Sequence, residues 1–133
     1  MPLILKFEQS HDLLSDALYD LEDIIETDPQ NSADLTNALG IFGSLFDQAI
    51  RTMQAFLSMQ GINDAKAPGD IILRSYYENI IPDSELWNEM FTFRSEDTSE
   101  LNTDDLLFRY NIIREVYYPA VSSLYDILDE KRN

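Results

Sequence analysis

The chain has 133 residues, a length that fits one compact domain whose core needs neither a metal ion nor disulfides. It contains no cysteine, which excludes disulfides, thiol catalysis and cysteine-bound zinc. The 25 Asp and Glu against 9 Lys and Arg give a net charge of -16, which disfavours direct binding to RNA or DNA.

Nothing in the sequence indicates a membrane protein or an exported one. The two longest stretches without a charged residue, 35–46 and 52–63, have 12 residues each and are too short to cross a bilayer. The opening MPLILKFEQS has no basic region before its apolar run and no cleavage pattern after it, so we expect no signal peptide. These features, with the lack of cysteine, predict a single cytoplasmic domain over residues 1–133.

A first helix is predicted from Ser10, as its N-cap, to Asp28-Pro29, which ends it. Its apolar residues recur at steps of four and three, the period of one helix face. Its acids follow one another without an intervening base, which indicates a solvated face or, alternatively, a dock for a basic partner. The apolar residues are Leu14, Leu18, Leu21 and Ile25, and the acids are Asp12, Asp16, Asp20, Glu22, Asp23, Glu26 and Asp28.

A longer second helix should start between Ser32 and Asp34 and stop at Gly61. Gly40 and Gly43 lie inside it, at a cost of roughly 1 kcal/mol each in helix propensity. We therefore predict that they mark the close approach of another backbone. The apolar stripe of this helix consists of Leu35, Leu39, Phe42, Phe46, Ala49, Met53 and Phe56.

Two shorter helices follow. Pro68 is predicted to be the first residue of the third helix, which Pro82 ends. Asp83 or Ser84 caps the fourth helix, which fades after Phe93. The third helix should bury Ile72, Leu73, Tyr76, Ile80 and Ile81, and the fourth Trp87, Met90 and Phe91.

The last helix opens at Thr103, with Asp104 and Asp105 in its first turn, and Pro119 should kink it or restart it near Tyr118. No strand-like alternation competes with the helical pattern. The sequence therefore predicts an all-α fold, an antiparallel up-and-down four-helix bundle with an additional short helix. The stripe of the last helix is Leu106, Tyr110, Ile113, Tyr117, Ala120, Leu124 and Ile127.

Catalytic and metal-binding motifs are missing. The sequence has no GxGxxG, P-loop, HExxH or nucleophile elbow. Glu8 and His11 have the Glu-x-x-His spacing of di-iron bundles, but such sites need two of these pairs and the chain has one histidine. We interpret His11 as an ordinary residue at the start of the first helix. No metal or cofactor is predicted.

Arg94 is a charged residue on an otherwise apolar helix face. It follows Trp87 by seven residues and so shares a helix face with Trp87 and Phe91. A charge on an apolar face needs a partner. One interpretation is a local pair with Asp97 that fixes the end of the helix. The other is that Arg94 faces a groove or a dimer interface and binds an anion there.

Several short runs together indicate a family. They are the aromatic repeat IFGSLFDQAIR, the QGI turn, APGDIILRSYY, IIPDSELWNEM ahead of an arginine, and YYPAVSSL. In this order and spacing, residues 35–128 resemble the HEPN-type nucleotidyltransferase substrate-binding proteins. The resemblance implies an all-helical bundle, usually a homodimer, that associates with a minimal nucleotidyltransferase encoded beside it in a toxin–antitoxin-like pair. In toxins of the wider superfamily the bundle cleaves RNA and that subunit restrains it.

The family's catalytic motif is an arginine, four residues, then a histidine, often followed two positions later by a tyrosine that the partner modifies with adenylate. Arg94 matches the arginine, whereas Ser99 and Leu101 stand where the histidine and the tyrosine would be. Serine cannot exchange a proton near neutral pH as imidazole does. The departure therefore predicts a non-catalytic partner of a nucleotidyltransferase, which presents a substrate to that enzyme or restrains it, and not an enzyme.

Two other functions remain open. One is a ribonuclease of the same superfamily with altered chemistry, and the other is an acidic mimic of nucleic acid that binds a basic protein through Asp12, Asp16 and Asp23. A core role for Trp87 is an alternative to a role in contacts. The residues predicted to line a groove or an interface are Arg94, Trp87, Phe91, Asp83 and Ser99.

Overall fold

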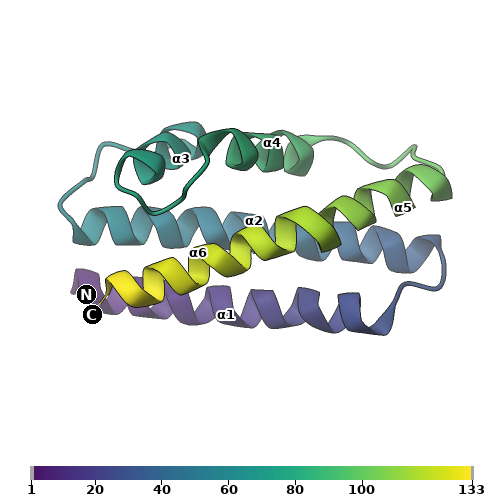
Figure 1. The fold of residues 1–133 in the computed structure, drawn as a ribbon, viewed down its shortest axis with the longest axis horizontal. Coiled ribbons are helices and arrows are strands. Elements are labelled where there is room, and N and C mark those ends of the chain that lie inside the picture. The colour runs from purple at the N-terminus through teal and green to yellow at the C-terminus, as the bar shows by residue number, and fades with distance from the viewer. Residues whose placement is uncertain (1, 133) are drawn as a thin grey trace.

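A computed structural model describes residues 2–132 as an all-helical bundle, which confirms the predicted fold class. The long helices α1 and α2 lie side by side and antiparallel, and the chain from α5 to α6 crosses them as one interrupted helix (Figure 1). The two short helices α3 and α4 together complete the bundle along α2. The elements are α1 Leu3–Thr27, α2 Ser32–Met59, α3 Pro68–Tyr77, α4 Ser84–Ser95, α5 Thr103–Ile112, the π-helical turn η1 Ile113–Tyr117 and α6 Tyr118–Lys131.

The first helix starts earlier than predicted, at Leu3, so Ser10 is not its N-cap. The reason is that the apolar stripe runs back to Phe7, which is fully buried. Ser10 lies inside the helix, where its hydroxyl is 2.9 Å from the hydroxyl of Thr52 and accepts a hydrogen bond from Gln48 at 2.9 Å. In this polar cluster, which lies between α1 and α2, the side chains satisfy one another's hydrogen bonds. The cluster therefore helps to fix how the two helices align.

The junction of α1 and α2 agrees with the prediction. Asp28 has a positive φ of 62°, so the helix cannot continue through it, and Pro29 follows. Asn31 caps α2 by accepting the backbone N–H of Asp34 at 2.9 Å. At the other end of α2, Gly61 adopts a φ of 87°, the left-handed conformation that glycine tolerates best.

The third helix begins at Pro68 as predicted but ends at Tyr77 instead of Pro82. Asn79 takes a positive φ of 60°, and the backbone N–H of Ile80 bonds back to the carbonyl of Ser75 at 2.8 Å. This closes the helix as a Schellman-type end. Ile80 and the residue after it are buried, so the apolar pattern crosses the end of the helix without interruption.

The last helix restarts at Tyr118, as Pro119 predicts, and a π-helical turn precedes the restart. The backbone N–H of Tyr118 bonds to the carbonyl of Ile113, five residues earlier, and Pro119 itself has no N–H to donate. Across the wide turn the core face rotates only slightly, because the predicted Leu124 stays in it. Beyond it Val121, Leu124 and Leu128 are buried, whereas the predicted Ala120 and Ile127 are only half-buried.

The centre of the bundle is aromatic. The Phe42 ring stacks on that of Tyr117 at 5.4 Å and meets that of Phe93 edge-on at 5.6 Å. These rings join α2, α4 and η1 beneath the end of α4, where Arg94 lies. None of the helices within residues 2–132 has the length and apolarity needed to cross a membrane.

Candidate functional site

The five predicted site residues lie on α4 and in the segments beside it, but they do not converge on one pocket. Asp83 and Trp87 line an apolar cleft against α6, whereas Arg94 lines a polar pocket against α2. Phe91 stacks its ring against α2, and Ser99 lies in the loop between α4 and α5 and lines neither pocket. Their role as contacts to another molecule therefore stays a prediction.

The apolar cleft has a volume of 140 Å³, and the two predicted residues that line it are held by the fold itself. Trp87 is only 2% exposed, and its ring lies 6.1 Å from that of Phe46. The Asp83 carboxylate caps α4, as predicted, by accepting the backbone N–H groups of Glu85 at 2.8 Å and Leu86 at 3.3 Å. The cleft is thus a gap in the packing beside a core tryptophan.

Arg94 pairs with Asp47 of α2 and not with Asp97, which corrects the local pairing expected from the sequence. Its Nη2 lies 2.9 Å from Asp47 Oδ2, and its Nε lies 3.3 Å from Oδ1. This two-point hydrogen bond raises the pKa of Arg94. Asp97 instead accepts the backbone N–H of Ser99 at 2.9 Å, which lowers the pKa of Asp97. The motif arginine therefore joins α4 to α2.

Gly43 makes room for this pair. A Cβ at Gly43 would stand 2.8 Å from the Nε of Arg94, so the guanidinium lies directly on the bare backbone of α2. A close approach does occur at Gly43, but the predicted partner was wrong, because the group that approaches is a side chain and not a backbone. At Gly40 it was wrong, because nothing would come within 4 Å of a Cβ there.

Replacing each of these two glycines with alanine should increase the stability of the fold by different amounts. We expect Gly40→Ala to raise the free energy of unfolding by about 0.5–1 kcal/mol, because alanine favours the helix and meets nothing. Gly43→Ala should gain less, because its methyl group pushes Arg94 away from Asp47. Denaturant unfolding measures both values. In an Arg94→Ala background, Gly43→Ala should give the full increase in the free energy of unfolding. An equal increase in the wild-type and the Arg94→Ala backgrounds would contradict the contact between Gly43 and Arg94.

A second arginine, Arg109 of α5, lies in the polar pocket and was not singled out from the sequence. It donates from Nη2 to the carbonyl of Phe93 at 3.0 Å, and its guanidinium lies 3.9 Å from the centre of the Phe93 ring. Its Nη1 is 3.5 Å from a carboxylate oxygen of Glu96. Its position in the sequence, beside Leu106 and Tyr110 of the apolar stripe, could have indicated this role, because a long side chain there can cover the core.

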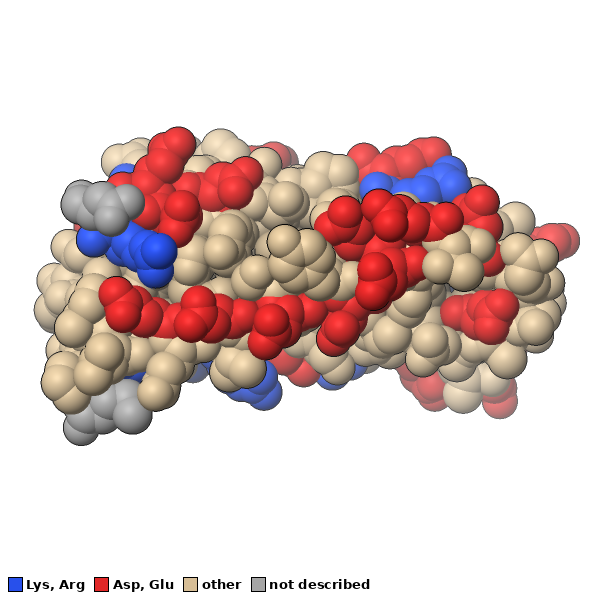
Figure 2. Space-filling model, turned by 90° about the horizontal axis from the view of Figure 1, so that it is seen from below, with Lys and Arg blue, Asp and Glu red and all other residues tan. Residues whose placement is uncertain are grey.

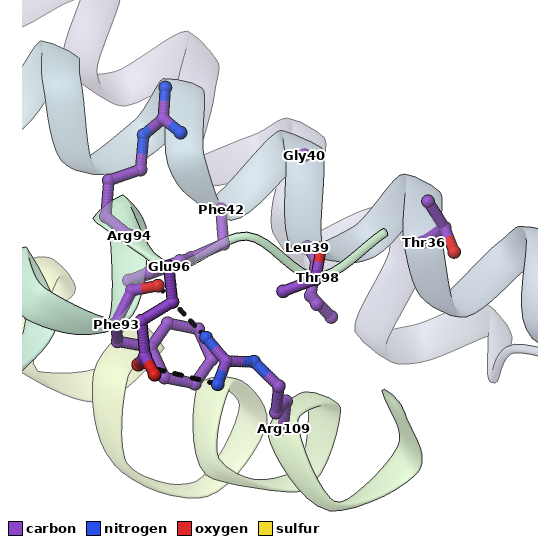
Figure 3. Close-up of a pocket in the computed structure, with 9 residues that line it drawn as sticks. All are labelled: Thr36, Leu39, Gly40, Phe42, Phe93, Arg94, Glu96, Thr98 and Arg109. Atoms are coloured by element: carbon purple, nitrogen blue, oxygen red, sulfur yellow. Dashed lines mark hydrogen bonds and ion pairs between the residues drawn. The ribbon is translucent and has the colours of Figure 1, made fainter. Parts of the chain in front are cut away.

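The pocket has a volume of 210 Å³, and the charges of its two arginines are balanced by Glu96 in its lining and by Asp47 beside it. Figure 3 shows the guanidinium of Arg109 facing Phe93 and Glu96, whereas that of Arg94 points away toward α2. Each arginine thus has a carboxylate beside it, which weakens any attraction to a phosphate. None of the described residues that line the pocket is a histidine. The lining residues are Thr36, Leu39, Gly40, Phe42, Phe93, Arg94, Glu96, Thr98 and Arg109.

The single histidine does not supply the missing acid–base group. His11 lies inside α1, is 1% exposed, and stacks on the ring of Tyr125 at 4.0 Å. It is a core residue and does not stand at the start of the helix, as the sequence had suggested. Between residues 2 and 132, no three His, Cys, Asp or Glu side chains gather closely enough to hold a metal ion. The described residues thus give the polar pocket hydrogen-bonding groups but no imidazole for proton transfer.

The acids of α1 form a separate feature. They run as a nearly continuous line along the face that Figure 2 shows, with few basic side chains beside them. None of these carboxylates forms an ion pair with a described residue. Glu22 is the one of them whose carboxylate forms a hydrogen bond with another described helix, since its Oε2 accepts the hydroxyl of Tyr118 at 3.2 Å.

Tyr118 should make the fold sensitive to alkali. Burial, followed by the negative charge of Glu22, raises the pKa of Tyr118 from 10.0 to about 12. Its contribution to stability is therefore complete below pH 10.0 and is lost as the pH rises toward about 12. We expect Tyr118→Phe to flatten this alkaline loss in denaturant unfolding, whereas Tyr77→Phe, at an exposed position, should not. Parallel pH profiles for Tyr118→Phe and the wild type would contradict the assignment.

The fold and the site define a small all-helical bundle whose polar pocket carries two arginines, each beside a carboxylate. A family model described as "nucleotidyltransferase substrate binding protein like" matches residues 6–130. The chain therefore belongs to the nucleotidyltransferase substrate binding protein like family. The match confirms the resemblance drawn from residues 35–128 and extends it over most of α1. A search of curated proteins found no match.

Proposed function

We propose that the protein is a non-catalytic, cytoplasmic subunit that binds a minimal nucleotidyltransferase encoded beside it, in a toxin–antitoxin-like pair. Residues 1–133 act as one HEPN-like domain that forms a homodimer, and the subunit presents a substrate to the enzyme or restrains it. The family match supports a role beside a nucleotidyltransferase. The residues proposed to contact the partner are Trp87, Phe91, Arg94, Asp83 and Ser99.

One observation carries the non-catalytic part of the proposal. The motif arginine, Arg94, is held on α2 by Asp47 at 2.9 Å, and Ser99 takes the place of the motif histidine. An arginine that is neutralised by a carboxylate attracts a phosphate weakly, and a serine hydroxyl does not act as a base near neutral pH. The pocket therefore has an arginine already paired with a carboxylate and no histidine among the described residues beside it, which argues against metal-free cleavage of RNA.

Co-expression with the product of the neighbouring gene tests the proposal. We expect the two proteins to co-elute in a defined ratio, with a mass in solution that contains two copies of this chain. Size-exclusion chromatography with light scattering measures both properties. Separate elution of the two proteins, or a neighbour that is not a nucleotidyltransferase, would overturn the proposed function.

The purified protein should leave RNA intact. Because Ser99 stands in place of the motif histidine and Arg94 is paired with Asp47, we expect no more cleavage than in a protein-free control. Gel analysis of a labelled RNA after prolonged incubation measures this. Cleavage that disappears in Arg94→Ala would revive the ribonuclease alternative, whereas cleavage that persists in Arg94→Ala would indicate a contaminant.

A further inference from the structure

The outer face of α3 exposes three large apolar or aromatic side chains. Leu73 is 47% exposed, Tyr76 42% and Tyr77 64%. Leu73 and Tyr76 were predicted to lie in the core, and this was wrong because Ile71 and Ile72 occupy the inner face. A ten-residue helix that already buries one face needs no apolar residues on the other. Such an exposed group of side chains is typical of a contact surface.

The polar groups beside this face have a specific arrangement. Asp70, Leu73 and Tyr77 follow one another at steps of three and four residues, so they form one line along α3. They line a broad hollow of 540 Å³ between α3 and the segment before it. Arg74, which also lines the hollow, is paired with Asp64 at 3.3 Å. Asp70 forms no hydrogen bond or ion pair with a described residue, so its carboxylate is available to a partner.

This line fits a long cationic side chain. The aliphatic part of an arginine or lysine would lie on Leu73, and its charge would lie between the Asp70 carboxylate and the face of the Tyr77 ring. The net charge of -16 favours the approach of a cationic surface over an anionic one. A purely apolar partner would leave the Asp70 carboxylate without a partner.

We infer that the outer face of α3, defined by Asp70, Leu73, Tyr76 and Tyr77, is the surface on which the nucleotidyltransferase docks, through an arginine or lysine flanked by apolar residues. The inference rests on the proposed function and adds to it a place and a partner chemistry. It also separates docking from the polar pocket of Arg94, which lies toward the opposite end of α2 (Figure 1).

The experiment compares matched variants in the complex of the full chain with the neighbouring nucleotidyltransferase. Tyr77→Ala is matched by Tyr19→Ala on α1, because both tyrosines are 64% exposed. Asp70→Asn is matched by Asp20→Asn, which removes one exposed carboxylate from the acidic helix. Titration calorimetry at two salt concentrations gives the Kd of each pair, and circular dichroism checks that every variant is folded.

Tyr77→Ala should weaken binding at least about tenfold, because a partly buried aromatic contact dominates interfaces of this kind. Asp70→Asn should weaken it by roughly threefold to tenfold and reduce its dependence on salt. Tyr19→Ala and Asp20→Asn should stay within about twofold of the wild type.

The outcomes distinguish the inference from the function on which it rests. A complex whose Kd is unchanged by Tyr77→Ala and Asp70→Asn overturns the docking surface and leaves the proposed function standing. Weakening by Tyr19→Ala and Asp20→Asn instead would move the contact to the acidic face of α1 and overturn the inference in the same way. A wild-type chain that forms no complex overturns both the proposed function and the docking partner.

Discussion

Replacing Trp87 with alanine is expected to lower the free energy of unfolding by about 3–5 kcal/mol. The side chain is 2% exposed and packs on α2, 6.1 Å from the ring of Phe46, so its removal leaves a large cavity in the core. Denaturant unfolding followed by circular dichroism measures the loss. Phe108→Ala is the control, because Phe108 is 69% exposed and its loss should cost less than about 0.5 kcal/mol.

The same experiment separates the two roles that the sequence allowed for Trp87. A variant that keeps its stability but loses the nucleotidyltransferase would contradict the core role and make Trp87 a contact. A variant that loses several kcal/mol cannot report on binding, because its unfolded fraction rises as well. Contacts are then better tested at exposed positions such as Tyr77.

His11→Ala should cost about 2–3 kcal/mol, by comparison with other buried side chains truncated to alanine. The ring stacks on Tyr125 at 4.0 Å and on Phe7 at 5.4 Å, and its Nε2 donates to the backbone carbonyl of Tyr125 at 3.1 Å. The variant loses the stack and this hydrogen bond and leaves a cavity in the core. Thermal or denaturant unfolding measures the cost.

Two further variants test why His11 matters. His11→Phe keeps the stack but not the hydrogen bond, so it should lose less stability than His11→Ala. Gln9→Ala, at an exposed position two residues away, should change stability by less than about 0.5 kcal/mol. An equal and small effect of all three variants would contradict a structural role for the histidine.

Capping residues and prolines in the sequence predicted most helix boundaries correctly. The start of α3 at Pro68, the cap of α4 at Asp83 and the restart of the last helix at Tyr118 are all confirmed, because each depends on neighbouring residues alone. The predicted start of α1 failed although Ser10 is a good capping residue. Burial of Phe7 against Phe56, across a ring distance of 5.4 Å, outweighs that local preference.

The candidate site depends on contacts between residues distant in the chain, and these could not be predicted. Arg94 and Asp47 are 47 positions apart, and nothing near either residue indicates the other. The local alternative Asp97 was available in the sequence, but its carboxylate turns back to the backbone of Ser99. Gly43 did carry a signal, since a buried helical glycine suggests a close approach, yet the approaching group could have come from any other helix.

The π-helical turn between α5 and α6 sets which side of α6 is buried. The buried positions run through it without a break, from Tyr117 to Val121, Leu124 and Leu128. Each residue added to a helix rotates all that follows by about 100°. Inserting one further residue in the turn would therefore bring Ala120 and Ser123 toward the core in place of Val121 and Leu124. The number of residues in this one wide turn thus decides whether α6 offers large or small side chains to the bundle.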